Sequence, residues 1–467
     1  MQVLLNFTLQ STFYIYGMLG LMFSFKCLIE ENYNSSIYFI TSIVSLIIGY
    51  LFKVLFFKEH INFKNFIFTI FSSWLLLILV SSIPYYSLIK LLDFTEIIFL
   101  STSYITTTGL SLNYYDYMKE NDTLFIWSSL TQLIGGVFSI LTFILFFLVL
   151  FNKNEKLVIF NKILILKFLL YYFFLLFLYI LFLNFFLDDY TNSFLIASAI
   201  ISTGGIIGEN GHLLEHYLSD NNYLTAYTFL MFVTIFILPI FLYLQNPKIM
   251  KIYYLNFFKR SFFLIIVLSL VLLVLINKSF LNLRESLFVF LSFVSTTGLL
   301  PNKFENLDYL EQIYPLFFLF VMLVMIGSFS GSSSGGLKID RLGIIFIKIK
   351  DELTKLTLRH KVYGTELIKK GSNQKELNSL YALIAFGIFI MIFALLLLSM
   401  SGKNIFESFA FSIAALTNTG DGFLHLYGVD ITKNSNVIII LNLLMICGRF
   451  EIIGYLLIVQ KLSIKVN

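Results

Sequence analysis

Thr107-Thr108-Gly109-Leu110 ends an apolar run that is too short to cross a membrane, and a similar string ends three later runs. The later copies read Ser202-Thr203-Gly204-Gly205, Thr296-Thr297-Gly298-Leu299 and Asn418-Thr419-Gly420-Asp421. Gly204 follows Gly109 by 95 residues, Gly298 follows after a further 94 and Gly420 after a further 122. Thirteen residues before these glycines stand Glu96, Thr191, Glu285 and Glu407. Ordinary turn chemistry explains one such string, but four in phase indicate an internal repeat.

The composition of the chain is that of a membrane protein. Of its 467 residues, 58% are hydrophobic and 13% are charged, whereas a soluble domain carries roughly 25% charged residues. The polar surface is therefore too small for a soluble particle, which excludes the soluble, disordered and disulfide-scaffold classes. Cys27 and Cys447 are the two cysteines, and their spacing matches no metal or redox motif. The remaining class is a helical protein that crosses the membrane several times.

Ten runs are long enough to supply the roughly 20 apolar residues of a membrane span. They lie at about 11–29, 37–57, 65–88, 123–151, 163–187, 222–245, 261–278, 313–337, 378–400 and 436–460. Four shorter runs, at about 94–107, 192–202, 284–296 and 405–417, are expected to be re-entrant half-helices. Lysines such as Lys53, Lys162 and Lys338 gather on one predicted face, and acidic residues gather on the other. The positive-inside rule then places both termini in the cytoplasm.

The predicted fold is an all-α polytopic membrane protein, with four pseudo-symmetric helix–pore-loop–helix repeats around a central pore and two N-terminal transmembrane helices. We expect the helix pair at 1–63, the repeats at 64–152, 153–246, 247–350 and 377–467, and a basic cytoplasmic linker at 351–376. Glycine allows backbone angles at which successive carbonyls turn toward a common axis. Four such loops can replace the hydration shell of a cation with carbonyl oxygens, while the half-helices aim their partly negative ends at it. The four quoted strings are therefore the predicted ion filter.

Three further motifs resemble those of a known family. They are Gln132-Leu133-Ile134-Gly135-Gly136, Gly327-Ser328-Phe329-Ser330-Gly331-Ser332-Ser333-Ser334-Gly335-Gly336-Leu337-Lys338 and Gly448-Arg449-Phe450-Glu451. They are similar to the Q-x-x-G-G, G-x-x-x-G-S-x-x-G-G-[IL]-K and G-R-x-E elements of the membrane subunit of the bacterial Trk/Ktr potassium uptake family. Nearly the whole chain carries this resemblance, and the two helices before the first repeat favour the TrkH-like branch.

The resemblance implies potassium uptake across the bacterial cytoplasmic (inner) membrane by a homodimer that is not an enzyme and holds no organic cofactor. It also implies a cytosolic nucleotide-binding ring of the TrkA/KtrA type, docked on the basic stretch at 348–375. That stretch also suits anionic lipid headgroups, or a positive-inside loop with no partner.

The choice of ion follows from the resemblance as well. In the family, serine in place of a filter glycine accompanies sodium preference, whereas Gly109, Gly204, Gly298 and Gly420 are all glycine here. Potassium is therefore the expected ion, and a sodium-permeable or proton- or sodium-coupled cation transporter of the same superfamily is the alternative. Asp421 departs from the family's N-x-G-P-G string, which has proline at that position, and it adds a carboxylate beside the filter.

Residues 327–336 contain four Gly and five Ser inside the predicted inner helix of the third repeat. Glycine and serine at this density break a helix, and unwound backbone at membrane depth must line a cavity. We expect a gate about one helix length inward from the filter, formed by Gly327, Gly331, Ser332, Ser333, Ser334, Gly335, Gly336 and Lys338. The alternative is a packing kink. Arg449 and Glu451 are charges inside the apolar final helix. Arg449 is expected either to face the pore below the filter and tune ion occupancy, or to belong to a structural Arg–Glu pair between helices.

Two strings match enzyme motifs. His212-Leu213-Leu214-Glu215-His216 fits the H-x-x-E-H zinc pattern. A zinc-dependent intramembrane hydrolase is therefore a remote alternative to the transport function of the protein. Gly331-Ser332-Ser333-Ser334-Gly335 fits the G-x-S-x-G nucleophile elbow, which requires a preceding strand. A solvated outer loop and a broken membrane helix are the simpler interpretations of these two strings.

Overall fold

The computed structural model describes residues 2–55, 63–111, 118, 121–151, 162–207, 221–245, 283–301, 317–357, 374–425, 427, 429 and 434–449. The longer helices in these ranges are α1 (Gln2–Ile29), α2 (Ser35–Leu55), α3 (Phe63–Leu88), α6 (Asp122–Phe151), α7 (Lys162–Leu187), α9 (Asn221–Ile235), α15 (Ile339–Thr357), α17 (Gln374–Met400) and α20 (Ser435–Arg449). The shorter ones are α4 (Phe94–Ile105), α8 (Tyr190–Ser202), α10 (Ile237–Gln245), α12 (Leu283–Val294), α14 (Phe317–Ile326), α18 (Ile405–Leu416) and α19 (Asp421–His425).

Five of the described helices are long and apolar enough to cross a membrane: α1, α2, α3, α6 and α7. The pair α9 and α10 makes a sixth candidate span, bent by 60° at Phe236. The expected span at 261–278 lies outside the described residues, as do the beginning of 313–337 and the end of 436–460. α14 ends at Ile326, so the helix predicted to 337 stops where the Gly/Ser-rich stretch begins.

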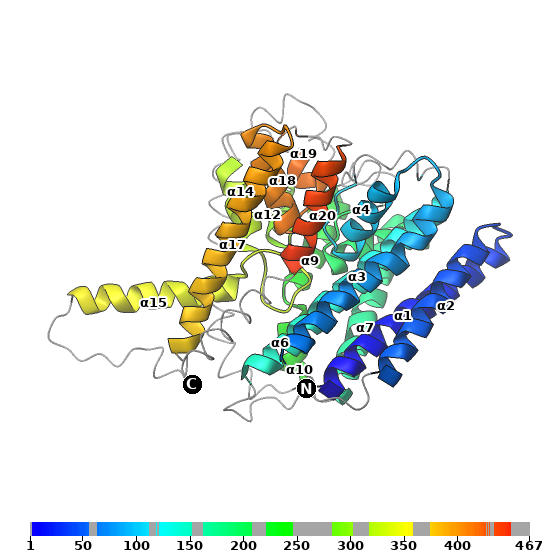
Figure 1. Cartoon of the computed structure of the whole chain (residues 1–467), viewed down its shortest axis with the longest axis horizontal. Helices are drawn as coiled ribbons and strands as arrows, with labels where there is room; N and C mark the ends of the chain where they lie inside the picture. The colour runs from blue at the N-terminus through cyan, green and yellow to red at the C-terminus, as the bar shows by residue number, and fades with distance from the viewer. Residues whose placement is uncertain are drawn as a thin grey trace.

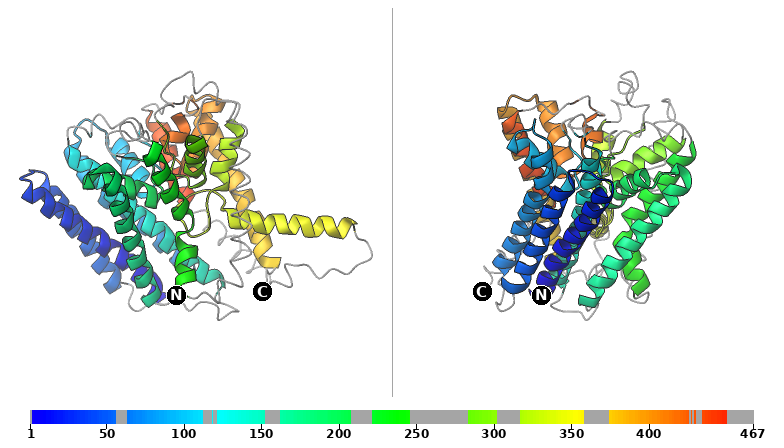
Figure 2. Two further views of the ribbon diagram at one scale, coloured as in Figure 1. Left: turned by 180° about the vertical axis from the view of Figure 1, so that it is seen from behind. Right: turned by 90° about the vertical axis from the view of Figure 1, so that its right-hand side faces the viewer.

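The outer helices expose apolar side chains, as helices in contact with lipid do. One face of α7 carries Leu170, Phe174, Phe177, Leu181 and Phe185, all of them exposed. Figures 1 and 2 show α1 and α2 packed side by side on one flank of the bundle. Small residues allow this close approach, because a Cβ on Gly17 would lie 2.6 Å from the Leu46 side chain.

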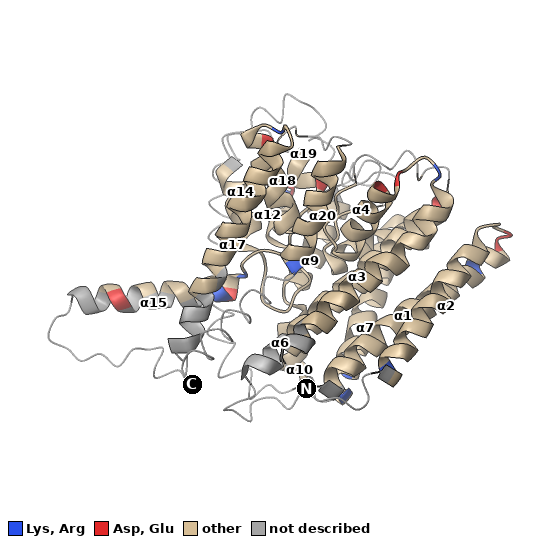
Figure 3. Cartoon of the chain, in the orientation of Figure 1, with Lys and Arg blue, Asp and Glu red and all other residues tan. Residues whose placement is uncertain are grey.

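The four half-helices α4, α8, α12 and α18 have the predicted positions to within two residues at each end. Figure 3 shows carboxylates, with a few basic residues among them, at the end of the bundle where α4 begins, and basic residues at the end where α7 begins. α15 projects sideways from the bundle, away from the half-helices (Figures 1 and 2). The four half-helices therefore pack against the longer helices, at the end of the bundle where most described carboxylates lie.

Candidate functional site

The four loops after the half-helices share one backbone conformation. Their first residues all have positive φ: 49° at Thr107, 56° at Thr203, 55° at Thr296 and 52° at Asn418. A positive φ is uncommon in residues other than glycine. The third residue is in each case a glycine with positive φ, namely Gly109 (80°), Gly205 (67°), Gly298 (72°) and Gly420 (83°). The loops are thus structural equivalents, as the repeat predicts.

This conformation corrects the alignment of the second repeat by one residue. Gly205, and not Gly204, has the left-handed conformation of Gly109, so Gly204 is equivalent to Thr108. The start of the half-helix agrees, because the third residue of α8 is Asn192, whereas the third residues of α4, α12 and α18 are the acids Glu96, Glu285 and Glu407. The offset to Thr191 was therefore wrong. The position equivalent to Gly109 is still glycine in all four loops.

The loops close into a ring, in which each third-position glycine faces the middle carbonyl of the next loop. A Cβ on Gly109 would lie 2.4 Å from the Gly204 carbonyl oxygen, and one on Gly205 would lie 1.8 Å from that of Thr297. A Cβ on Gly298 would lie 2.1 Å from the Thr419 oxygen, and one on Gly420 would lie 2.3 Å from the Thr108 oxygen. The fourth loop thus closes on the first, and each contact has room only for glycine.

Side-chain hydroxyls fasten three of the loops to their own half-helices. The hydroxyls of Thr106 and Thr108 lie 2.7 Å apart, those of Ser295 and Thr297 lie 2.6 Å apart, and those of Thr417 and Thr419 lie 2.8 Å apart. In each of these three loops the middle threonine therefore turns its side chain back toward the half-helix. Its hydroxyl is occupied there, so the main-chain carbonyls are the polar groups of the ring itself.

The half-helices point their C-terminal ends at this ring, because each loop follows directly on its helix. The first turns of α4 and α8 are capped by side chains. The Asp93 amide donates to Glu96 at 3.0 Å in a capping box, and the Thr191 amide donates to Asp189 at 2.8 Å. Donation from the Thr191 hydroxyl holds the pKa of the Asp189 carboxyl below its usual value. The recurring acid predicted from the repeat thus sits at the positive end of each of three half-helices, where it is stabilised.

The Gly/Ser-rich stretch forms a loop that leaves α14 and returns to the same point. The Leu337 amide donates to the Met325 carbonyl and the Lys338 amide to the Ile326 carbonyl, both at 2.8 Å. Gly327 (φ 66°) and Gly336 (φ 77°) lie on either side of this closed base. We call residues 327–338 the intramembrane loop. Lys338 is buried and its ammonium group donates to the Ser334 hydroxyl at 2.9 Å, inside the loop.

The intramembrane loop lies directly against the ring, on the side of the first loop residues, which we call the inner side. The Ser333 hydroxyl donates to the Ile201 carbonyl at 3.2 Å and accepts from Thr203 at 3.2 Å. The Gly335 amide donates to the Thr296 hydroxyl at 2.9 Å. The expected separation of one helix length was wrong, because the closed base lets the chain fold back toward the ring instead of continuing inward.

Arg449 joins the intramembrane loop to the first loop of the ring. Its Nε donates to the Thr106 carbonyl at 2.6 Å and its Nη2 donates to the Thr107 carbonyl at 3.3 Å, while Nη1 donates to the Ser333 carbonyl. The guanidinium group therefore lies at the inner side of the ring, where one of the two sequence interpretations placed it. Glu451, the other charge of the final helix, lies outside the described residues.

The Q-x-x-G-G element on α6 packs behind the first two loops. A Cβ on Gly135 would lie 1.9 Å from the Ile105 carbonyl oxygen, and one on Gly136 would lie 2.9 Å from the Cα of Ser202. These are the last residues of α4 and α8. The two glycines let α6 approach both half-helix ends, and Gln132 extends toward Gly204 one turn earlier.

The contacts of Asp421 could not be predicted from the sequence. Its amide donates to the Gly109 carbonyl at 2.9 Å, and its carboxylate accepts from the Ser111 amide at 2.9 Å and from the Ser111 hydroxyl. The Asn418 side-chain amide of loop four donates to the Thr108 hydroxyl of loop one at 2.7 Å. The carboxylate thus joins loops one and four on the outer side of the ring.

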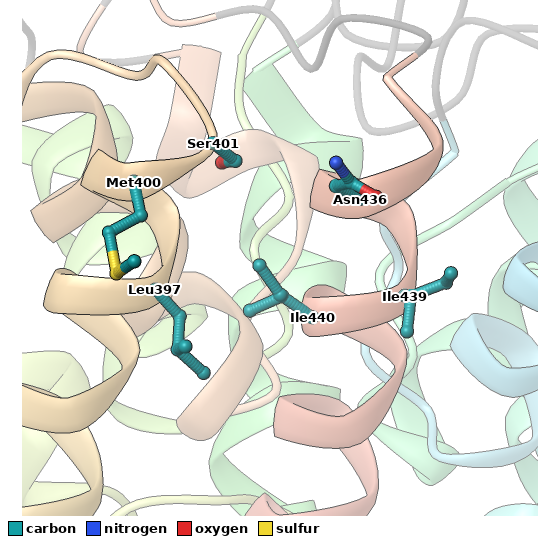
Figure 4. Close-up of a pocket in the computed structure, with 6 residues that line it drawn as sticks. All are labelled: Leu397, Met400, Ser401, Asn436, Ile439 and Ile440. Carbon is teal, nitrogen blue, oxygen red and sulfur yellow. The ribbon is translucent and has the colours of Figure 1, made fainter.

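The enzyme-like strings find no support in the described structure. His212, Glu215 and His216 lie outside the described residues. Gly331-Ser332-Ser333-Ser334-Gly335 follows a helix and not a strand, so it lacks the frame of a nucleophile elbow. A hollow between α17 and α20, drawn in Figure 4, lies on the outer surface and not at the ring; Met400 is 84% exposed and Ile439 47% exposed.

No protein-family model matches the chain. The Trk system potassium uptake protein TrkH of Escherichia coli (strain K12) is 25% identical to it over 227 residues, which are 46% of this chain and 45% of the relative. The TrkH protein of Salmonella typhimurium is 24% identical over 184 residues, 39% of this chain and 37% of the relative. These alignments thus span less than half of the curated relatives.

A solved structure matches the chain over nearly its whole length. The crystal structure of the potassium transporter TrkH from Vibrio parahaemolyticus has a TM-score of 0.76 at 20% sequence identity, covering 96% of this chain and 98% of that one. The ring of four loops, the helical bundle and this match together give the chain a TrkH-like fold.

Proposed function

We propose that this protein conducts potassium ions across the bacterial cytoplasmic membrane through the ring of four loops. The observation that carries the proposal is the closure of the ring, in which every third-position glycine faces the middle carbonyl of the next loop. The partial sequence similarity to potassium uptake proteins agrees with this choice of ion.

The chemistry of the ring suits a dehydrated cation. Carbonyl oxygens can replace the water around an alkali ion, and each of the four loops contributes its middle carbonyl to the ring. The half-helices add the partly negative ends of four helix dipoles. A membrane potential supplies roughly 2.3 kcal/mol per charge for each 100 mV, which favours uptake into a negative interior.

The intramembrane loop is the proposed gate, and the described conformation is its closed state. The loop contacts residues from the second and third repeats by hydrogen bonds, and a Cβ on Gly335 would lie 1.8 Å from the Thr417 carbonyl oxygen of the fourth. Arg449 extends the contact to the first repeat. Opening would require the loop to break these few hydrogen bonds and to withdraw from the ring.

Tracer flux into liposomes tests the proposal. Purified protein would be reconstituted, and uptake of rubidium, a potassium analogue, compared with uptake of sodium under an imposed membrane potential. We expect rubidium uptake to exceed sodium uptake. Sodium uptake equal to or above rubidium uptake would assign the chain to the sodium-permeable alternative. The same flux, driven by a concentration gradient at zero potential, with and without proton and sodium gradients, tests coupling.

Three assignments accompany this proposal. The acidic end of the bundle faces outward, so both termini lie in the cytoplasm, and labelling of single cysteines introduced near residues 30 and 53 would test that. Cross-linking in membranes would test the homodimer. Binding of a TrkA/KtrA-type nucleotide-binding ring, measured with and without substitution of the basic stretch 348–375, would test the regulatory partner.

Zinc analysis of the purified protein tests the alternative function of a zinc-dependent hydrolase. Stoichiometric zinc would support that alternative.

A further inference from the structure

The second loop of the ring differs from the other three at its middle position. Thr108, Thr297 and Thr419 occupy this position in loops one, three and four, and each shares a hydrogen bond with the hydroxyl two residues earlier. Gly204 occupies it in loop two and has no side chain to make that bond. The φ angle of Gly204 is not among the positive values of the chain, so its backbone does not require glycine.

The Gln132 side chain, which comes from α6, fills the place of the missing threonine. A Cβ on Gly204 would lie 2.4 Å from Gln132 Oε1, 2.8 Å from its Cδ and 3.1 Å from its Cγ. Gln132 is completely buried, and its Nε2 donates to the Ile206 carbonyl at 3.4 Å, just beyond the ring. Contacts under 3.0 Å mean that the Gln132 side chain must shift before residue 204 can carry a side chain of its own.

We propose that Gln132 is a positioning residue of the ring, which supports loop two from outside as the middle threonines support the other three loops from within. This inference rests on the proposed function of the ring. The Gly204 carbonyl is the one that faces Gly109 of loop one, and Gln132 packs against the residue that carries it. Loss of the glutamine side chain leaves this carbonyl without lateral support, and a void beside a close-packed ring allows it to move.

Loop two already has a hydroxyl oxygen, that of Ser202, which could accept a hydrogen bond from a threonine at residue 204. The Ser202 hydroxyl donates to the Ser198 carbonyl at 2.6 Å, as the Thr106 hydroxyl donates to the Thr102 carbonyl at 2.6 Å. Ser202 precedes Gly204 by two residues, just as Thr106 precedes Thr108 by two residues. Gly204→Thr combined with Gln132→Ala would therefore rebuild loop two on the pattern of the other three.

A double-substitution cycle tests the inference. Gln132→Ala and Gly204→Thr would each be compared with the combined variant by rubidium and sodium uptake in liposomes and by unfolding temperature. We expect each single variant to have a lower preference for rubidium and a lower unfolding temperature than the unsubstituted protein. In the combined variant, both quantities should return much of the way to their original values. Residues in contact couple by 0.5–3 kcal/mol, or roughly twofold to more than a hundredfold in selectivity. Gln132→Ala combined with Gly387→Thr is the control, because nothing lies within 4 Å of a Cβ on Gly387.

The outcomes separate the two proposals. If the unsubstituted protein takes up sodium as readily as rubidium, the proposed function fails, while the coupling in unfolding temperature still decides the role of Gln132. If the two substitutions add without rescue in both measurements, or if Gln132→Ala alone equals the unsubstituted protein, the inference about Gln132 is wrong. If Gly204→Thr alone does not fold, the folded state of the combined variant is itself the rescue, and failure of both to fold counts against the inference.

Discussion

Gly205→Ala should disturb the ring more than any other single methyl group added to its third-position glycines. Gly205 has a φ of 67°, and a Cβ there would lie 1.8 Å from the Thr297 carbonyl oxygen, the shortest of the four ring contacts. The left-handed conformation costs an alanine roughly 1–2 kcal/mol. Ordinary contact begins at 3.4 Å, so the two loops must separate by about 1.6 Å, which removes most of their packing contact.

We expect the rubidium preference of Gly205→Ala to fall by about tenfold or more, because about 1.4 kcal/mol of lost discrimination corresponds to a tenfold change. The assay is the ratio of rubidium to sodium uptake in liposomes, with the unfolding temperature measured in parallel. Gly402→Ala is the matched control, because Gly402 has a φ of 89° but nothing lies within 4 Å of its Cβ. It carries the backbone strain without the ring contact.

The comparison of these two variants decides the question. Backbone strain alone should lower the unfolding temperature of both proteins, whereas only Gly205→Ala should change selectivity. Equal selectivity in Gly205→Ala and the unsubstituted protein would refute the assignment of Gly205 to the ion path. Equal loss of selectivity in Gly402→Ala would show that strain, and not the ring contact, is responsible.

Three further variants test other parts of the site. Gly298→Ser should lower rubidium preference, since its Cβ would lie 2.1 Å from the Thr419 oxygen; unchanged uptake ratios would contradict the filter assignment. Deletion within 328–335 should raise ion leak into liposomes, because the intramembrane loop then no longer reaches the ring, and unchanged flux would remove the loop as the gate. Asp421→Asn should slow rubidium uptake more at about 0.01 M salt than at about 1 M, where the Debye length falls from roughly 30 Å to 3 Å. An effect independent of salt would mean that Asp421 acts through its hydrogen bonds to Ser111 and not through its charge.

The half-helices were predictable because local sequence determines them. α4 and α18 are apolar runs that begin after a polar residue and are followed by a Thr-Thr-Thr-Gly or Thr-Asn-Thr-Gly string, so composition and turn chemistry mark both ends. The register of the second loop was not predictable in the same way. Gly204 and Gly205 are adjacent and chemically identical, and only the φ angles distinguish the residue that faces the next loop.

The position of the intramembrane loop depends on contacts that are distant in sequence. The Gly/Ser composition predicts that the helix breaks after Ile326. The depth of the loop is set by Ser333 and Gly335, which bond to residues of the second and third repeats, and by the pairing of Leu337 with Met325. The hydrogen bonds between Asp421 and the first loop likewise join residues 310 positions apart, which no local pattern can reveal.

One chain supplies all four segments of the ring, and this has a consequence for how such a ring can change. In an assembly of identical subunits, every mutation appears at each corner at once. Here a single replacement alters one corner, and the glutamine behind the second segment and the carboxylate beside the fourth are differences of that kind. The four segments of the ring can therefore change one at a time in evolution, as long as each new residue still fits the neighbouring segment that it contacts.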